Sequence, residues 1–136
     1  MSALASDYHE LPRFAFGDNP ALADELLALV LAGRKTATCM TRDDPNRPRP
    51  GERWIVLDGS GEPRCVIETR EITECRFDDV DEAFAYDEGE GDRTLETWRR
   101  NHSVYFGRLG KFEEGMTVVC ERFRLVKVFG APGAGK

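Results

Sequence analysis

The sequence predicts an α+β fold: a small, curved or closed sheet of mostly antiparallel strands, two main helices and one short helix. The 136 residues suffice for one hydrophobic core, and no linker or internal repeat divides them. Strand-like and helix-like segments differ in length and do not alternate regularly, which argues against a doubly wound parallel sheet. Apolar residues make up 40% of the chain and charged residues 32%, a balance typical of a globular protein.

The first helix is expected at about 20–32. Asn19 can cap its N-terminus, Pro20 suits its first position, and Gly33 can end it. Apolar residues at helical spacing predict the face that packs on the core: Leu22, Leu26, Leu29 and Val30. The segment therefore carries signals for both ends and for one buried face.

Strands are expected in four places. The first covers 36–40 and is followed by an irregular loop with three prolines. The next two, at 53–57 and 64–76, are joined by a turn with the sequence Asp-Gly-Ser-Gly. The last, at 116–129, is rich in β-branched and aromatic residues, and it should bend near Glu121, where its apolar phase changes.

Two helices are expected between the last two strands. A short one near 79–86 has Val80 and Phe84 four residues apart, and a longer one runs over about 94–106. Apolar and aromatic residues recur along the longer helix, before the stop at Gly107: Leu95, Trp98, His102, Tyr105 and Phe106. We expect this face, His102 included, to pack into the core.

The charge composition narrows the classes of partner. Nineteen basic and 25 acidic residues give a net charge of -6, which argues against an extended DNA-binding clamp but allows a small basic cleft. The longest strongly apolar run, 26–32, is far shorter than the roughly 20 residues that span a bilayer. The polar N-terminus does not form a secretory signal. We therefore expect a cytoplasmic protein without membrane association, and its oligomeric state stays open.

The four cysteines do not form a pattern typical of a zinc site. Cys39, Cys65, Cys75 and Cys120 include no CxxC pair, and both histidines lie far from them in the sequence. Three of them lie in strand-like apolar stretches and are expected to be packing residues: Cys39, Cys65 and Cys120. No metal ligand and no cofactor are therefore assigned.

Charges of opposite sign gather in two segments. Residues 33–53 are basic, whereas residues 78–92 carry eight carboxylates and no lysine or arginine. An acidic run is ordinarily a solvated surface. The functional alternative is that a few of these carboxylates face the basic segment across a cleft.

The sequence GRKTAT at 33–38, which leads from the first helix into a strand, resembles a motif of the ASCH family. Two further segments support the resemblance: GERW at 51–54, and EGEGD at 88–92 before the aromatic helix. The chain is similar to the longer bacterial ASCH proteins over about 14–129. This resemblance implies a single domain with a PUA-like β-barrel. We expect the residues on either side, 1–13 and 130–136, to form flexible termini.

The resemblance also implies a cleft that binds RNA or a modified nucleoside. Some small ASCH proteins remove the acetyl group from N4-acetylcytidine, and others have been linked to RNA cleavage. In the amidohydrolases a lysine, a threonine three residues later and a more distant glutamate carry the reaction. These roles map onto Lys35, Thr38 and Glu90, with Glu88 as the competing carboxylate because the segment before the long helix is one residue longer here.

Substrate contacts are expected from Arg34, Thr36, Arg42, Glu88 and Tyr105. Small amidohydrolases have an arginine two residues after the threonine, where this chain has Met40. Arg42 lies two residues further, on the same face of a strand, so it could replace that arginine only if the substrate sits differently.

The chemistry sets two conditions. A threonine hydroxyl needs a base, and Lys35 can serve if burial or a neighbouring cation lowers its pKa. A nearby carboxylate could pass the proton to the leaving amine, although it would also favour the charged lysine. On a regular strand Lys35 and Thr38 would face opposite sides, so a bend after Gly33 must bring them together.

Three functions stay open at this point. The first is hydrolysis of an N4-acylated cytidine, and the second is an RNA-binding module without chemistry. The third is a ribonuclease in which Lys35 stabilises phosphate charge and the acidic segment recruits a divalent metal ion. For the first function, we expect Lys35→Ala and Thr38→Ala to reduce turnover by several orders of magnitude with little change in thermal stability.

Overall fold

The computed structural model describes residue 8 and residues 10–129; residues 1–7, 9 and 130–136, including most of the expected flexible termini, lie outside this description. The elements confirm the α+β class and follow one another in this order: β1 (Arg13–Phe14), α1 (Pro20–Leu31), β2 (Ala37–Thr41), β3 (Arg53–Leu57), β4 (Pro63–Arg76), the 3-10 turn η2 (Phe77–Asp79), α2 (Glu82–Glu88), α3 (Leu95–Arg108) and β5 (Thr117–Val128). The expected short helix at 79–86 is divided between η2 and α2.

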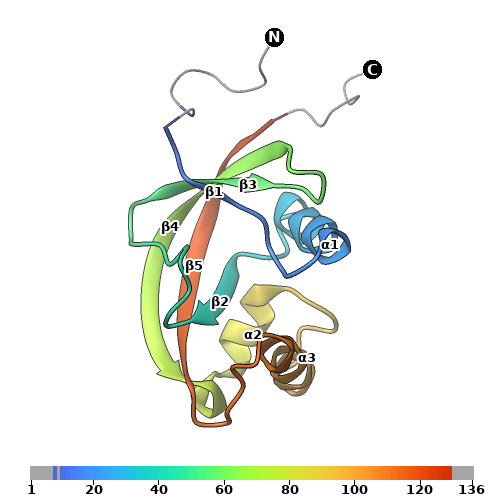
Figure 1. The fold of residues 1–136 in the computed structure, drawn as a ribbon, viewed down its shortest axis with the longest axis vertical. Coiled ribbons are helices and arrows are strands. Elements are labelled where there is room, and N and C mark those ends of the chain that lie inside the picture. Colours follow the sequence, from blue (N-terminus) through green and yellow to red (C-terminus); the bar gives the residue numbers. More distant parts are fainter. Residues whose placement is uncertain (1–7, 9, 130–136) are drawn as a thin grey trace.

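The five strands form one curved sheet in the order β1-β3-β4-β5-β2. Only β1 pairs in parallel, with β3, so the sheet is mixed and mostly antiparallel as predicted. β4 and β5 form a long twisted ribbon that runs through the molecule (Figure 1). The edge strands β1 and β2 are not neighbours in this order, so the barrel implied by the resemblance is open between them.

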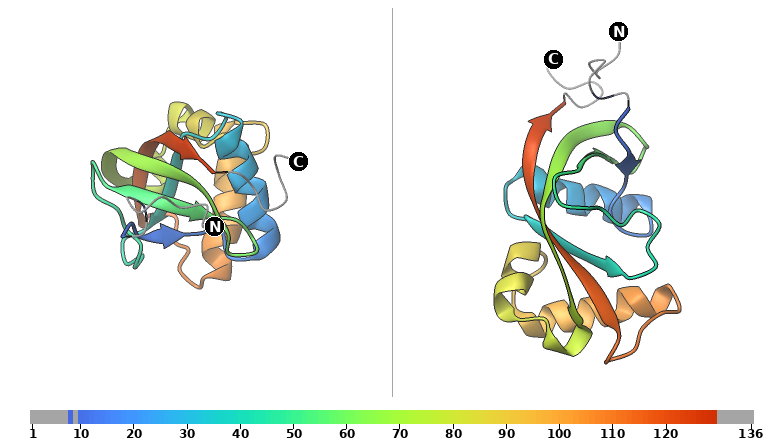
Figure 2. Two further views of the ribbon diagram at one scale, coloured as in Figure 1. Left: turned by 90° about the horizontal axis from the view of Figure 1, so that it is seen from above. Right: turned by 90° about the vertical axis from the view of Figure 1, so that its left-hand side faces the viewer.

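The helices pack mainly on one side of the sheet, at two different levels (Figures 1 and 2). α1 lies beside the end that holds β1 and β3, whereas α2 and α3 lie beside the other end of the β4–β5 ribbon. The buried core accordingly has two main clusters, one around Leu26, Leu27 and Phe123 and one around Trp98 and Phe106. No helix within the described ranges is long and apolar enough to cross a membrane.

Both ends of α1 form as the sequence indicates. The side chain of Asn19 accepts a hydrogen bond from the amide of Leu22 at 2.8 Å, which satisfies a free helix donor. Gly33 has a φ of 77°, in the left-handed region. The amides of the next two residues then donate back to the carbonyl of Leu29, at 2.9 Å and 3.1 Å, so the chain reverses and Lys35 enters the interior.

The pairing of β4 with β5 is irregular near Glu121, where the alternation of apolar residues was expected to change phase. Thr69 faces Phe123 and Glu71 faces Arg122, so Arg70 is an extra residue that forms a bulge. The extra residue at this point belongs to β4, whereas the sequence indicated a bend in β5. The Thr69 hydroxyl lies here 2.7 Å from Oε2 of Glu121. A second shift, where Val66 faces Lys127 and Ile67 faces Leu125, makes Val126 an extra residue of β5.

Candidate functional site

A cavity of about 470 Å³ lies between the helices and the open sheet, within the usual range for small-molecule sites. Both edge strands contribute to its wall, together with the interior face of the sheet, α1 and α3. Aromatic side chains form part of the wall: Phe14, Phe16, Trp54 and Tyr105. Thr38 and five carboxyl side chains supply polar groups: Glu25, Asp44, Glu88, Glu90 and Glu121.

The basic segment after α1 and the acidic segment after α2 are joined by backbone contacts. A Cβ at Gly89, where φ is 74°, would lie 2.3 Å from the carbonyl oxygen of Arg34, so this approach requires glycine. The Arg34 guanidinium donates to the carbonyls of Gly89 and Gly91, each at 2.8 Å. The amide of Thr36 donates to the carbonyl of Asp87 at 2.8 Å. The two segments of opposite charge therefore face each other.

Lys35 is buried among carboxylates. Its Nζ lies 3.0 Å from Oε1 of Glu88 and 2.7 Å from Oε2 of Glu90, and its side chain is fully buried. Burial alone would lower the pKa of Lys35, but the two carboxylates outweigh that effect and raise it. The lysine is therefore held charged, and of the two opposing effects that the sequence left open, the ion pairs dominate.

The two glutamates have different environments. The Glu88 carboxylate is buried; its Oε2 accepts from Nε1 of Trp98 at 3.0 Å, and its Oε1 lies 3.5 Å from Nε2 of His102. Burial would raise the pKa of Glu88, but the charges of Lys35 and His102 lower it. Glu90 is partly exposed, and burial together with the charge of Glu88 raises its pKa despite Lys35. Glu88 thus anchors the cluster, whereas Glu90 can exchange a proton.

His102 is a satisfied core residue, as expected. A carbonyl only accepts, so Nδ1 donates to the carbonyl of Trp98 at 2.9 Å, and the imidazole stacks on that indole. Burial would lower the pKa of His102, but the Glu88 carboxylate raises it above the usual value. His102 and Lys35 thus both face the Glu88 carboxylate, which favours their charged forms.

Thr38 and Glu121 lie directly opposite each other on β2 and β5. Both side chains are in the cavity wall, and the Glu121 side chain is buried. Burial raises the pKa of Glu121 to about 7, although the hydrogen bond from Thr69 lowers it in part. Sequence reasoning marked Glu121 as the place where β5 changes phase, and missed it as a site residue.

The structure gathers only part of the expected site around the cavity. Thr38, Glu88, Glu90 and Tyr105 are in its wall. Lys35 lies behind the carboxylates and is not one of the lining residues. It contacts both glutamates, so the bend after Gly33 does bring the lysine and the acidic segment together.

Three expected substrate contacts lie elsewhere. Arg34 ties the two segments together, and the exposed Thr36 hydroxyl lies 3.4 Å from the carbonyl of Asp87. The exposed Arg42 pairs with Glu74 at 3.4 Å, whereas Met40 is itself in the cavity wall. In this conformation the structure does not bring Arg42 to the position of the expected arginine.

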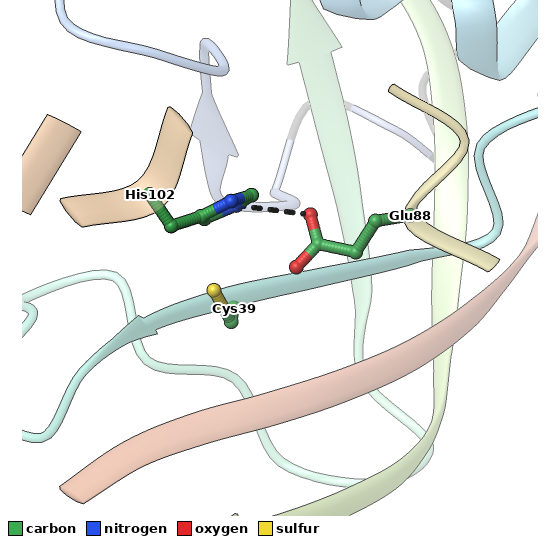
Figure 3. A group of neighbouring side chains, drawn as sticks. All are labelled: Cys39, Glu88 and His102. Carbon is green, nitrogen blue, oxygen red and sulfur yellow. Dashed lines mark ion pairs between the residues drawn. The ribbon is translucent and has the colours of Figure 1, made fainter. Parts of the chain in front are cut away.

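Cys39, Glu88 and His102 approach one another from three different elements (Figure 3). One ligand atom from each lies within 4.8 Å of the other two, a grouping that spacing in the sequence did not reveal. Oε1 of Glu88 already binds the Lys35 ammonium, and burial raises the pKa of the Cys39 thiol well above its usual value. A soft divalent ion would therefore have to displace the ammonium and deprotonate the thiol, so the charges present fit an ion pair better than a metal.

Comparison with known proteins identifies relatives over most of the described region. The model of the ASCH domain matches residues 12–127. The crystal structure of an ASCH domain from Lactobacillus crispatus JV V101 is 29% identical, with a TM-score of 0.77 over 92% of this chain and 87% of that one. Protein EF3133 from Enterococcus faecalis V583 is 33% identical, with a TM-score of 0.78 over 90% and 83%.

A more distant solved structure shares the fold alone. ASCH from Zymomonas mobilis is 10% identical, with a TM-score of 0.54 over 87% of this chain and 71% of that one. Among curated proteins, none matches this sequence.

Proposed function

The chain belongs to the ASCH domain family, and from this premise we propose that its cavity binds a modified nucleoside and hydrolyses an N4-acylcytidine-type amide. The observation that carries the proposal is the position of Thr38 in the wall of a cavity that also contains Glu90. A hydroxyl nucleophile and a carboxyl group that can exchange protons are the two groups that acyl transfer requires.

The cavity wall favours a neutral heterocycle over a phosphate. Five carboxyl groups line the cavity, whereas its two basic lining residues, Arg108 and His102, are already paired with Asp18 and Glu88, so little positive charge is left for an anion. Glu90 and Glu121 can accept hydrogen bonds from the N–H groups of a base. Trp54 and Tyr105 provide aromatic surface against which a base can stack. The substrate class is therefore a nucleoside.

The reaction replaces an amide with a transient ester. The Thr38 oxygen attacks the acyl carbon, and the C–N bond breaks as the amine nitrogen gains a proton from Glu90, whose raised pKa suits a proton donor. Water then cleaves the ester, so that one amide and one water give a carboxylic acid and the free cytosine amine. Lys35 stays charged 2.7 Å from Glu90 and holds that carboxylate in place.

The alternative functions depend on phosphate contacts, and the basic groups suggested for such contacts are engaged elsewhere. Lys35 is buried behind carboxylates. Arg42 pairs with Glu74, as does Arg47 in the proline-containing loop that follows β2. An RNA-binding module or a ribonuclease would have to break these pairs, which makes both less well supported than a nucleoside site.

The test is incubation of the purified protein with N4-acetylcytidine and with longer N4-acyl analogues, followed by chromatographic measurement of cytidine. We expect cytidine release by the wild type and none by Thr38→Ala. Binding of these compounds without release by the wild type would reject the hydrolase and leave a binding module. Cleavage of RNA that a chelator abolishes would favour the ribonuclease instead.

A further inference from the structure

The proposed reaction needs a base for Thr38, and the structure removes the expected candidate. Lys35 has two carboxylates on its Nζ, which raise its pKa, so it carries its proton at neutral pH. Nδ1 of His102 donates to a carbonyl and Nε2 faces Glu88, so this ring is also committed. Another group has to take the hydroxyl proton.

The pairing of β2 with β5 places a candidate base beside Thr38. Thr38 and Glu121 form a directly opposite pair, and such side chains share one face of an antiparallel sheet with Cβ atoms about 4.5–5.5 Å apart. Both side chains are in the wall of the same cavity. We propose that Glu121 is the general base that takes the Thr38 proton, an assignment that rests on the proposed function.

The contacts of Glu121 suit this role. The Thr69 hydroxyl donates to Oε2 at 2.7 Å and fixes the carboxylate, which leaves Oε1 to accept from Thr38. Burial raises the pKa of Glu121 to about 7; Thr69 and the charge of Lys35 lower it, and Glu52 raises it. A base with a pKa near the working pH is present in its ionised form and still binds a proton well.

The first half of the reaction transfers the acyl group to the protein. Oε1 of Glu121 removes the hydroxyl proton as the Thr38 oxygen forms a bond to the acyl carbon, and the carbonyl electron pair moves onto its oxygen. When this pair returns, the C–N bond breaks and the nitrogen takes a proton from Glu90. The products at this stage are the free amine, an ester on Thr38, protonated Glu121 and deprotonated Glu90.

The second half returns both carboxyl groups to their starting states. Deprotonated Glu90 takes a proton from water, whose oxygen attacks the ester carbon. The carbonyl electron pair moves onto its oxygen and returns as the ester C–O bond breaks, and the Thr38 oxygen receives the proton held by Glu121. The sum is one amide and one water converted into one acid and one amine.

The first test compares Glu121→Gln with Glu68→Gln. Gln keeps the shape and the acceptor for Thr69 but is not a base, so turnover of N4-acetylcytidine should fall by about 10²–10⁴-fold. Glu68 is a matched control, because it is a glutamate of β4 that pairs with Arg53 and Arg124 and is not a lining residue. Turnover by Glu68→Gln should equal that of the wild type.

A second variant should change the pH dependence of kcat/KM, which a purely structural role of Glu121 would leave unchanged. Thr69→Val removes the hydrogen bond that lowers the pKa of Glu121, so the acidic limb of the kcat/KM profile should shift to higher pH. An unchanged limb in Thr69→Val, together with wild-type turnover in Glu121→Gln, would overturn the assignment. Thr69→Val keeps the assignment testable if Glu121→Gln does not fold.

An activated ester separates this inference from the proposed substrate. We expect p-nitrophenyl acetate to acetylate Thr38 in the wild type and in Glu68→Gln, and much more slowly in Glu121→Gln, as measured by peptide mass spectrometry. If the wild type leaves N4-acetylcytidine intact but shows this pattern, the substrate proposal fails and the base assignment stands. Equal acetylation of Thr38 in Glu121→Gln and the wild type, or none in either, would overturn the assignment.

Discussion

Lys35 and Glu88 form an ion pair of 3.0 Å in which both side chains are buried. Removal of one partner from such a pair leaves an uncompensated charge in the interior, which typically costs about 3–5 kcal/mol. Lys35→Met should therefore lower the free energy of unfolding by about this amount, measured by urea denaturation. The sequence suggested little change in stability, because it did not show that Lys35 is buried.

The matched control for this prediction is Arg42→Met. Arg42 also pairs with a glutamate, Glu74, but its side chain is 64% exposed. Exposed pairs contribute about 0–1 kcal/mol, so this variant should unfold almost as the wild type does. Equal stability of Lys35→Met and Arg42→Met would show that the buried cluster contributes nothing to folding.

Thr38 allows chemistry to be separated from stability. It is half-buried on the edge strand β2, so neither Thr38→Ala nor Thr38→Ser should change the melting temperature much. Turnover of N4-acetylcytidine should fall by several orders of magnitude in Thr38→Ala, whereas Thr38→Ser keeps a hydroxyl and should keep part of the activity. Full activity of Thr38→Ala would exclude Thr38 as the nucleophile.

Glu88 and Glu90 should respond differently to the same substitution. Glu88→Gln removes a buried charge that Lys35 and His102 both face, so it should lower the melting temperature and, through the loss of that charge, lower the pKa of His102. Glu90→Gln removes the transferable proton of a group that is partly exposed in the cavity, so it should lower turnover more than stability. The measurements are thermal unfolding, turnover and NMR titration of the imidazole. The reverse pattern would make Glu88 the reacting carboxylate.

Much of the fold could be predicted from local signals. Asn19, Pro20 and Gly33 mark both ends of α1, and each acts within one turn of helix. β1 was missed because two residues, Arg13–Phe14, are too few to show an alternating pattern. The spacing of apolar residues also could not predict where the segment 77–88 divides into η2 and α2.

The site was less accessible from the sequence, because its properties arise from contacts between distant segments. The motif resemblance pointed to Lys35 and Thr38, but the pKa of Lys35 depends on two carboxylates more than fifty residues away. The choice between Glu88 and Glu90 depends on which of them α2 buries. Glu121 gave one local signal, an acidic residue within the apolar strand 117–128, which we interpreted as a change of strand phase.

The raised pKa of Glu121 also predicts how stability depends on pH. A carboxyl group whose pKa is about 7 in the folded protein and 4.5 as a model group binds more protons when folded. Its contribution is therefore fully present below pH 4.5 and is lost as the pH rises through 7. The shift corresponds to a loss of about 3 kcal/mol. Glu121→Gln has no charge to bury, so it should be free of this loss.

The measurable quantity is the difference in unfolding free energy between Glu121→Gln and the wild type from pH 4.5 to pH 8. Other titrating groups, Glu90 and His102 among them, are present in both proteins, so their effects largely cancel in this difference. The difference should grow in favour of Glu121→Gln and level off above pH 7, whereas Glu68→Gln should show no such rise, because the arginines beside Glu68 lower its pKa. A variant that loses turnover while it gains stability at alkaline pH would identify Glu121 as a group kept buried for chemistry at the expense of stability. A flat difference would place its titration outside this range and remove the basis for its role as a base.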